Sequence, residues 1–105
     1  MVCGALLKMM DYFISNITQA DIAKEKAKAR ELRASQWWKR KLAEGICHYC
    51  HRTFKPSELT MDHIVPIIRG GKSIKGNVAP CCKECNNKKK HMLPMEWDEY
   101  LKGME

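Results

Sequence analysis

Apolar side chains near the start of the chain follow a helical repeat. In residues 1–19 they recur three or four positions apart. The set comprises Val2, Ala5, Leu6, Met9, Met10, Phe13, Ile14 and Ile17. The pattern predicts an amphipathic helix that needs a surface to pack against. Because its polar face is not basic, we favour packing on this chain or on a second copy over a membrane surface. The helix is therefore the candidate contact for a homodimer.

Residues 18–44 predict one long helix, because the segment is rich in helix-forming residues. Thr18 followed by Asp21 is typical of a capping box, and Gly45 is a suitable stop. Lysine and arginine cover most of the helix around a thin, alanine-rich apolar face. Two interpretations stay open: a helix lying along a phosphate backbone, or a solvated helix with local ion pairs. Residues 1–44 thus form a predicted N-terminal helical extension.

The pattern changes in residues 45–105, where short apolar runs alternate with polar loops. The run ELTMDHIVP predicts a buried strand that ends at Pro66, and NVAP predicts the start of a second strand. The stretch RGGKSIKGN has the composition of a loop. KECNNKKKH predicts a helix, and Pro94 suits the first turn of a final helix that Gly103 closes. We therefore expect a small α+β domain over residues 45–105.

The length and composition of the chain indicate that its fold requires additional stabilisation and that its partners are anionic. The chain has 105 residues, six cysteines and a formal net charge of +7. A chain this short buries a modest core and requires a metal, a disulfide or oligomerisation. The charge favours nucleic acid as a partner, with an anionic membrane surface second. No apolar run is long enough to span a membrane, and the N-terminus lacks the basic residues of a signal peptide. We therefore expect a cytoplasmic protein with reduced cysteines.

Four cysteines form two CxxC pairs, Cys47 with Cys50 and Cys82 with Cys85. This spacing turns both sulfurs of a pair toward one ion and predicts a closed, tetrahedral, structural zinc site. Cys81 is an alternative to Cys82, but its spacing to Cys85 is three residues, so Cys82 is preferred. Three residues are expected to remain outside the metal shell: Cys3, His48 and His51.

An Asp-His pair, Asp62 and His63, lies between the two cysteine pairs. Consecutive side chains on a strand point to opposite faces, so one can reach a metal while the other reaches a water. Downstream, Asn77 and Asn86 are neutral amides that can ligate a metal or hold a loop. Carboxylate and amide oxygens suit magnesium or manganese, and a histidine can accept a proton from water near neutral pH.

The order CxxC, DHIVP, GG, Asn-Val, CxxCN and a basic tail resembles the HNH endonucleases, in particular their four-cysteine zinc subclass. The resemblance covers residues 45–91 and implies a zinc-stabilised ββα-metal fold. It implies that His63 is the general base and that Asp62 is a metal ligand. It further implies that Asn77 steadies the loop and the histidine. Asn86 falls where the family places its last histidine or asparagine, as second metal ligand, so the chain is an HNN variant.

What the resemblance implies is a metal-dependent endonuclease that hydrolyses DNA phosphodiester bonds by nicking or double-strand cleavage, with one catalytic Mg²⁺ or Mn²⁺. Two other interpretations remain: a non-catalytic zinc module that binds nucleic acid or protein, and an RNA-directed hydrolase with the same site. Basic side chains near the motif are the candidate contacts to DNA phosphates. They are Lys88, Lys89 and Lys90 on the predicted helix and Arg69, Lys72 and Lys75 in the loop. Phosphate contacts position a substrate without reading its sequence, so we expect weak sequence preference and strong salt dependence.

Overall fold

The computed structural model describes residues 16–103 of the chain. The predicted helix at the N-terminus and its suggested role in a homodimer fall largely on residues 1–15, as does Cys3, and they lie outside the described residues. Residues 16–18 lead into the first described helix as a turn and extended backbone. None of the helices within residues 16–103 combines the length and hydropathy needed to cross a membrane.

The basic segment folds as two helices rather than one. Helix α2 spans Gln19–Arg33 and helix α3 spans Gln36–Ala43. The predicted capping box is present at Thr18, and Gly45 follows the end of α3 with a positive φ of 69°. The prediction of a single helix is wrong because Ser35 caps α3: its hydroxyl accepts the Trp38 N–H at 3.2 Å and donates to a backbone carbonyl at the end of α2. These local hydrogen bonds replace the helical ones at that point.

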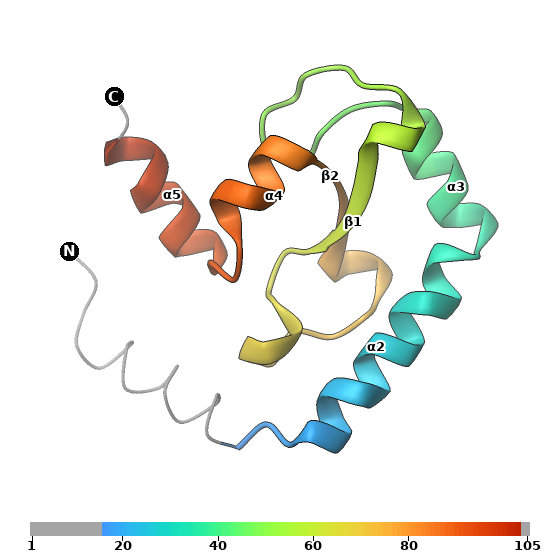
Figure 1. Ribbon diagram of the computed structural model, residues 1–105, viewed down its shortest axis with the longest axis vertical. Helices are drawn as coiled ribbons and strands as arrows, with labels where there is room; N and C mark the ends of the chain where they lie inside the picture. The colour runs from blue at the N-terminus through green and yellow to red at the C-terminus, as the bar shows by residue number, and fades with distance from the viewer. Residues whose placement is uncertain (1–15, 104–105) are drawn as a thin grey trace.

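Two antiparallel strands form the centre of the molecule (Figure 1). Strand β1 spans Leu59–His63 and strand β2 spans Val78–Cys82, with Asp62 opposite Ala79 in the ladder. Every residue of β2 is buried, as expected for a short apolar run covered on both faces. The loop between the strands contains two short 3₁₀ turns, η2 at Ile67–Arg69 and η3 at Lys75–Asn77.

Two further helices complete the fold. Helix α4 spans Lys83–Lys89 and follows β2 directly, and helix α5 spans Pro94–Gly103, both as predicted. In Figure 1, α2 and α3 line one side of the hairpin, while α4 and α5 lie on the other. Within residues 16–103 the structure thus holds four α-helices and one two-stranded antiparallel sheet, so the α+β prediction is confirmed.

The core is small and is built largely of sulfur. Its buried members come from the zinc-type motif and the two strands, namely Cys47, Leu59, Cys81, Cys82 and Cys85. An aromatic cluster extends it toward α5, with Tyr49 packed edge-on against Trp97 and Trp97 stacked on Tyr100. Trp38 of α3 is also buried and anchors that helix to the domain. So small a core gives limited stabilisation, and a metal held by the cysteines would add to it.

Candidate functional site

The two CxxC pairs meet at one point in space. The Sγ atoms of Cys47, Cys50, Cys82 and Cys85 all lie within 4.8 Å of one another, and the Cys50 and Cys82 sulfurs are 3.9 Å apart. Four sulfurs around a tetrahedral zinc lie about 3.8 Å apart, given Zn–S bonds of about 2.3 Å. The quartet is therefore positioned to bind a metal ion and fits structural zinc. Cys82 rather than Cys81 joins it, because adjacent strand residues point to opposite faces.

The surroundings of the quartet favour thiolate ligands. The backbone N–H of Cys82 donates to the Cys47 sulfur at 3.4 Å, and the Arg52 side chain donates to the Cys50 sulfur at 3.4 Å. Burial opposes ionisation of Cys50, but hydrogen bonds from Arg52 outweigh it and lower the pKa of this thiol to about 6. Arg52 is itself paired with Glu84 on α4. Four protein ligands would complete the shell of a metal and leave no open position, as in structural zinc sites. His48 and His51 are exposed beside it, as predicted.

Asp62 is buried on β1 and holds two partners on one oxygen. Its Oδ2 accepts the Tyr49 hydroxyl at 2.5 Å and lies 3.1 Å from the Lys89 ammonium. Burial, together with the hydrogen bond to Asp62, raises the pKa of Tyr49, so its hydroxyl stays a donor. Lys89 also donates to the backbone carbonyl of His63 at 3.2 Å. The Asp62 carboxylate is thus oriented by Tyr49, which lies between the first two cysteines, and by Lys89 of α4.

The side chain of His63, the next residue, has a different partner from that of Asp62. Its Nε2 atom lies 2.9 Å from the Ser73 hydroxyl oxygen in the loop between the strands. Burial lowers the pKa of His63, and the neighbouring Asp62 carboxylate only partly opposes this. The imidazole is therefore neutral near pH 7 and able to accept a proton. The divergent partners of Asp62 and His63 agree with the opposite faces expected of adjacent strand positions.

Asn77 fastens the two ends of the loop between the strands. Its Oδ1 accepts the Val65 N–H at 2.9 Å, and its Nδ2 donates to the Val65 carbonyl at 3.0 Å and to the Lys72 carbonyl at 2.9 Å. Gly71 packs beneath the same turn, where an added Cβ would lie 1.7 Å from the Val65 carbonyl oxygen. Only glycine fits there, which explains one half of the Gly-Gly pair. Asn77 contacts the loop and not the His63 ring, and its predicted catalytic role stays a prediction.

A surface hollow of about 280 Å³ brings together Asp62, His63 and Asn86. Its lining also includes three groups that can carry positive charge, Lys26, Lys90 and His91. Asn86 directly follows Cys85 on α4 and is exposed. The two candidate ligands of a divalent ion and the candidate base therefore share one opening. Their oxygen donors suit magnesium or manganese, although Lys89 already occupies one oxygen of Asp62.

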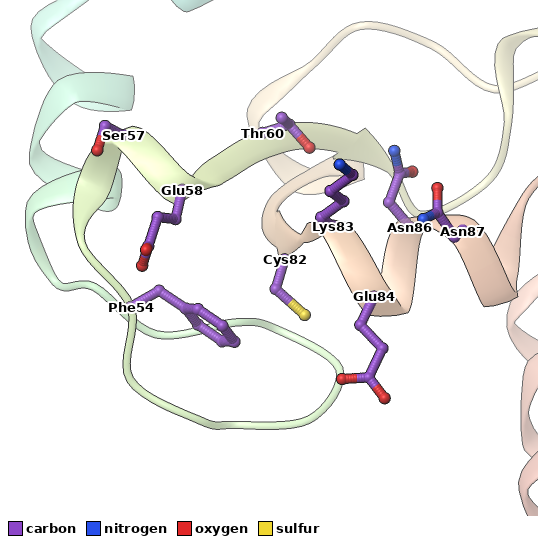
Figure 2. Close-up of a pocket in the computed structure, with 9 residues that line it drawn as sticks. All are labelled: Phe54, Ser57, Glu58, Thr60, Cys82, Lys83, Glu84, Asn86 and Asn87. Atoms are coloured by element: carbon purple, nitrogen blue, oxygen red, sulfur yellow. The ribbon is translucent and has the colours of Figure 1, made fainter.

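A larger hollow of about 650 Å³ adjoins this one on the other side of Asn86. Figure 2 shows it between the loop that carries Phe54, the start of β1 and α4. Asn86 and Asn87 lie at one end, and Phe54 and Glu58 lie at the other. Neither Asp62 nor His63 lines it. Asn86 thus stands on the ridge between two openings, and the smaller one holds the motif residues.

The predicted phosphate contacts do not share one environment. Lys89 is fully buried against Asp62, so the prediction that it contacts DNA is wrong. The physical reason is that its ammonium neutralises a buried carboxylate, a role that the run of three lysines conceals in the sequence. Arg69 is paired with Glu96 of α5. The four other candidates are exposed, and for them DNA contact stays a prediction: Lys72, Lys75, Lys88 and Lys90.

Three residues of this region were not identified from the sequence. Tyr49 lies between the first two cysteines, where an aromatic residue gives no hint of a bond to Asp62. Ser73 stands in a loop of ordinary turn composition. Glu25 lies on a helix full of charges, yet it is only 4% exposed and bonds to Ser73. No local signal marks the latter two, because their partners are distant in the chain.

Fold and site together define a small α+β metal-binding domain in which a strand-borne Asp-His pair and a helix asparagine face one hollow. A family model described as HNH endonuclease matches residues 47–101, just over half of the chain. The protein therefore belongs to the HNH endonuclease family, as the sequence resemblance predicted. Membership indicates a nuclease or nucleic-acid-binding role. A search of curated proteins found no match to this sequence.

Proposed function

We propose that this protein is a metal-dependent endonuclease that hydrolyses DNA phosphodiester bonds. One observation carries the proposal: Asp62, His63 and Asn86 line the same surface hollow. They come from strand β1 and helix α4, and Asn86 follows His63 by 23 positions in the chain. Family membership supports the reaction class. The proposal includes a cytoplasmic setting, in which zinc occupies the four-cysteine site.

His63 is the proposed general base. The ring is neutral near pH 7 because burial lowers its pKa, so it can take a proton from a water molecule. The water oxygen then forms a bond to phosphorus as the bond from phosphorus to the leaving oxygen breaks. The proton stays on the imidazole, and the departing alkoxide takes a proton from solvent.

Asp62 and Asn86 are the residues that would hold the catalytic divalent ion. A bound Mg²⁺ or Mn²⁺ supplies charge neutralisation at the phosphate and at the leaving oxygen. The fit rests on the chemistry of the donors, one carboxylate and one amide. It also rests on their shared opening. Tyr49 and Lys89 both engage Oδ2 of Asp62, so Oδ1 is the oxygen left to serve as ligand. Lys90 on the rim would attract the DNA backbone.

One observation favours a second candidate, a non-catalytic zinc module that binds nucleic acid. Asp62 is buried and already paired with Lys89, an arrangement that also makes sense as structure alone. Such a module would need the cysteines and the basic surface but not His63. RNA in place of DNA as substrate would use the same site.

The deciding experiment measures plasmid nicking by the full-length, zinc-loaded protein. Supercoiled plasmid is incubated with Mg²⁺ or Mn²⁺ and with the wild type, His63→Ala or His91→Ala. Loss of the general base is expected to reduce the rate by about 10²- to 10⁴-fold. His91→Ala is the matched control, because it deletes an imidazole from the rim of the same hollow, and it should retain most of the activity.

Two outcomes would overturn the nuclease proposal. Equal nicking by the wild type and by folded His63→Ala would trace the activity to a contaminant or another site. No cleavage of plasmid with either metal, alongside retained DNA binding in a gel-shift assay, would favour the non-catalytic module. A parallel reaction with labelled RNA separates the two nucleic acids as substrates.

A further inference from the structure

Helix α2, which the sequence places in an N-terminal extension, reaches the candidate base through one serine. Ser73 lies in the loop between the strands and is 7% exposed. Its hydroxyl oxygen is 2.6 Å from the backbone carbonyl of Glu25 on α2 and 2.9 Å from Nε2 of His63. The serine therefore bridges a helix remote in sequence and the ring proposed to activate water.

The directions of these hydrogen bonds follow from counting protons. A serine hydroxyl has one hydrogen to donate and two lone pairs with which to accept. The Glu25 carbonyl can only accept, so the Ser73 hydrogen points to it. Toward His63 the Ser73 oxygen must then accept, which places a hydrogen on Nε2. A neutral imidazole carries one N–H, so Nδ1 is the nitrogen with the free lone pair.

The Glu25 side chain secures the serine from a second direction. Its Oε1 accepts the Ser73 backbone N–H at 2.7 Å, and this hydrogen bond lowers the pKa of Glu25. Two ammonium groups lie near its other oxygen, Lys28 at 3.6 Å and Lys72 at 3.9 Å. Glu25 is buried, with a side chain that is 6% exposed. Both the backbone and the side chain of Ser73 are thus fixed by one residue of α2.

We infer that Ser73 and Glu25 are positioning residues that hold His63 as its Nε2–H tautomer, with Nδ1 free to take a proton from water. This inference rests on the proposed function, because it gives that function's base its orientation. An accepting serine suits both protonation states of the ring, since Nε2 carries a hydrogen before and after Nδ1 is protonated. Helix α2 is accordingly part of the catalytic unit rather than an appendage.

The direct test is the tautomer of His63 in the full-length, zinc-loaded protein without DNA. Two-bond ¹H–¹⁵N correlation spectra distinguish Nδ1–H from Nε2–H imidazoles, and the chain has only four histidines to assign. The His63 signals are identified by their absence from His63→Ala. At neutral pH the wild type is expected to show Nε2–H and an unprotonated Nδ1. A wild-type spectrum with hydrogen on Nδ1 would overturn the inference, whatever the variants do.

Three variants extend the test to function. Ser73→Ala removes the acceptor, so both tautomers should appear and the nicking rate constant should fall by about 10- to 100-fold with little change in KM, a loss typical of orienting partners. Ser73→Thr keeps the hydroxyl and should restore the wild-type tautomer and most of the rate. Ser57→Ala is the matched control, because Ser57 is exposed and does not line the hollow of His63. Unchanged tautomer and rate in folded Ser73→Ala would contradict the inference.

Failure of this inference and failure of the proposed function give different results. If the protein nicks DNA and Ser73→Ala changes neither the rate nor the His63 tautomer, the proposed function is retained and the positioning role of Ser73 is refuted. A wild type that shows the expected tautomer but does not nick DNA would refute the proposed function. Ser73 would then still orient His63, but that orientation would have no role in catalysis.

Discussion

The ammonium of Lys89 lies 3.1 Å from the Oδ2 atom of Asp62, and the lysine is completely buried. Tyr49 donates to the same oxygen, and the lysine ammonium lies 5.4 Å from the centre of the Tyr49 ring. Asp62 therefore lines its hollow with one carboxylate oxygen, Oδ2, already bound to two partners. A cation from α4 thus holds the strand residue that the proposed function makes a metal ligand.

Replacing Lys89 with methionine should destabilise the fold by about 3–5 kcal/mol, because it leaves the Asp62 charge buried without its partner. Urea denaturation followed by circular dichroism measures the change. Lys88→Met is the matched control and should cost far less, because Lys88 pairs with Glu84 at the surface. The double variant Lys89→Met/Asp62→Asn also removes the negative charge of Asp62. Its loss of unfolding free energy should therefore be smaller than the sum of the losses in the two single variants. Additive losses would argue that the pair is not coupled.

Cys82→Ser should abolish stoichiometric zinc binding and unfold the domain, whereas Cys81→Ala should retain both. Both cysteines are buried, but only Cys82 belongs to the quartet. A structural zinc site contributes on the order of 10 kcal/mol to folding, so a strong chelator should also remove the native circular dichroism of the wild type. Zinc content is read by native mass spectrometry. Metal loss from Cys81→Ala, or a native spectrum after complete removal of zinc, would refute the assignment.

Gly71→Ala should destabilise the protein by about 2 kcal/mol or more, since the new methyl group would collide with rigid backbone. Its Cβ would lie 1.7 Å from the Val65 carbonyl oxygen. Gly76→Ala is the control in the same loop, where an added Cβ meets no atom within 4 Å. Thermal unfolding of both variants provides the comparison. Similar melting temperatures would mean that the loop relaxes around Gly71 and that Asn77 alone fixes its shape.

Lys90→Gln should weaken DNA binding and lower the slope of log Kd against log salt by about 0.9, the value for one phosphate contact. Lys90 is exposed on the rim of the hollow that His63 lines. Binding is measured by fluorescence anisotropy in the His63→Ala background, so that the duplex is not cleaved. Lys102→Gln, on the exposed end of α5, should leave the slope unchanged. An unaltered slope in Lys90→Gln would exclude this lysine from the interface.

Local patterns were sufficient where neighbouring residues decide the outcome. The alternation and length of apolar runs predicted β1 and β2, although β1 ends at His63 and not at Pro66. Pro94 and Gly103 marked the ends of α5. The break between α2 and α3 was missed because one serine cap outweighed a long run of helix formers. That signal was present in the sequence at Ser35, but helix propensity summed over the segment concealed it.

The sequence by itself identified the four candidate metal ligands, because two cysteines in a CxxC pair are close neighbours in the chain. The order of its motifs resembled the HNH endonucleases, the family whose model matches residues 47–101. Tertiary structure decided which of three consecutive lysines is buried and which residues orient Asp62 and His63. Glu25 and Ser73 are 48 residues apart and meet only after α2 packs beside the loop between the strands. Such contacts depend on the packing of distant segments, and no local pattern of residues encodes them.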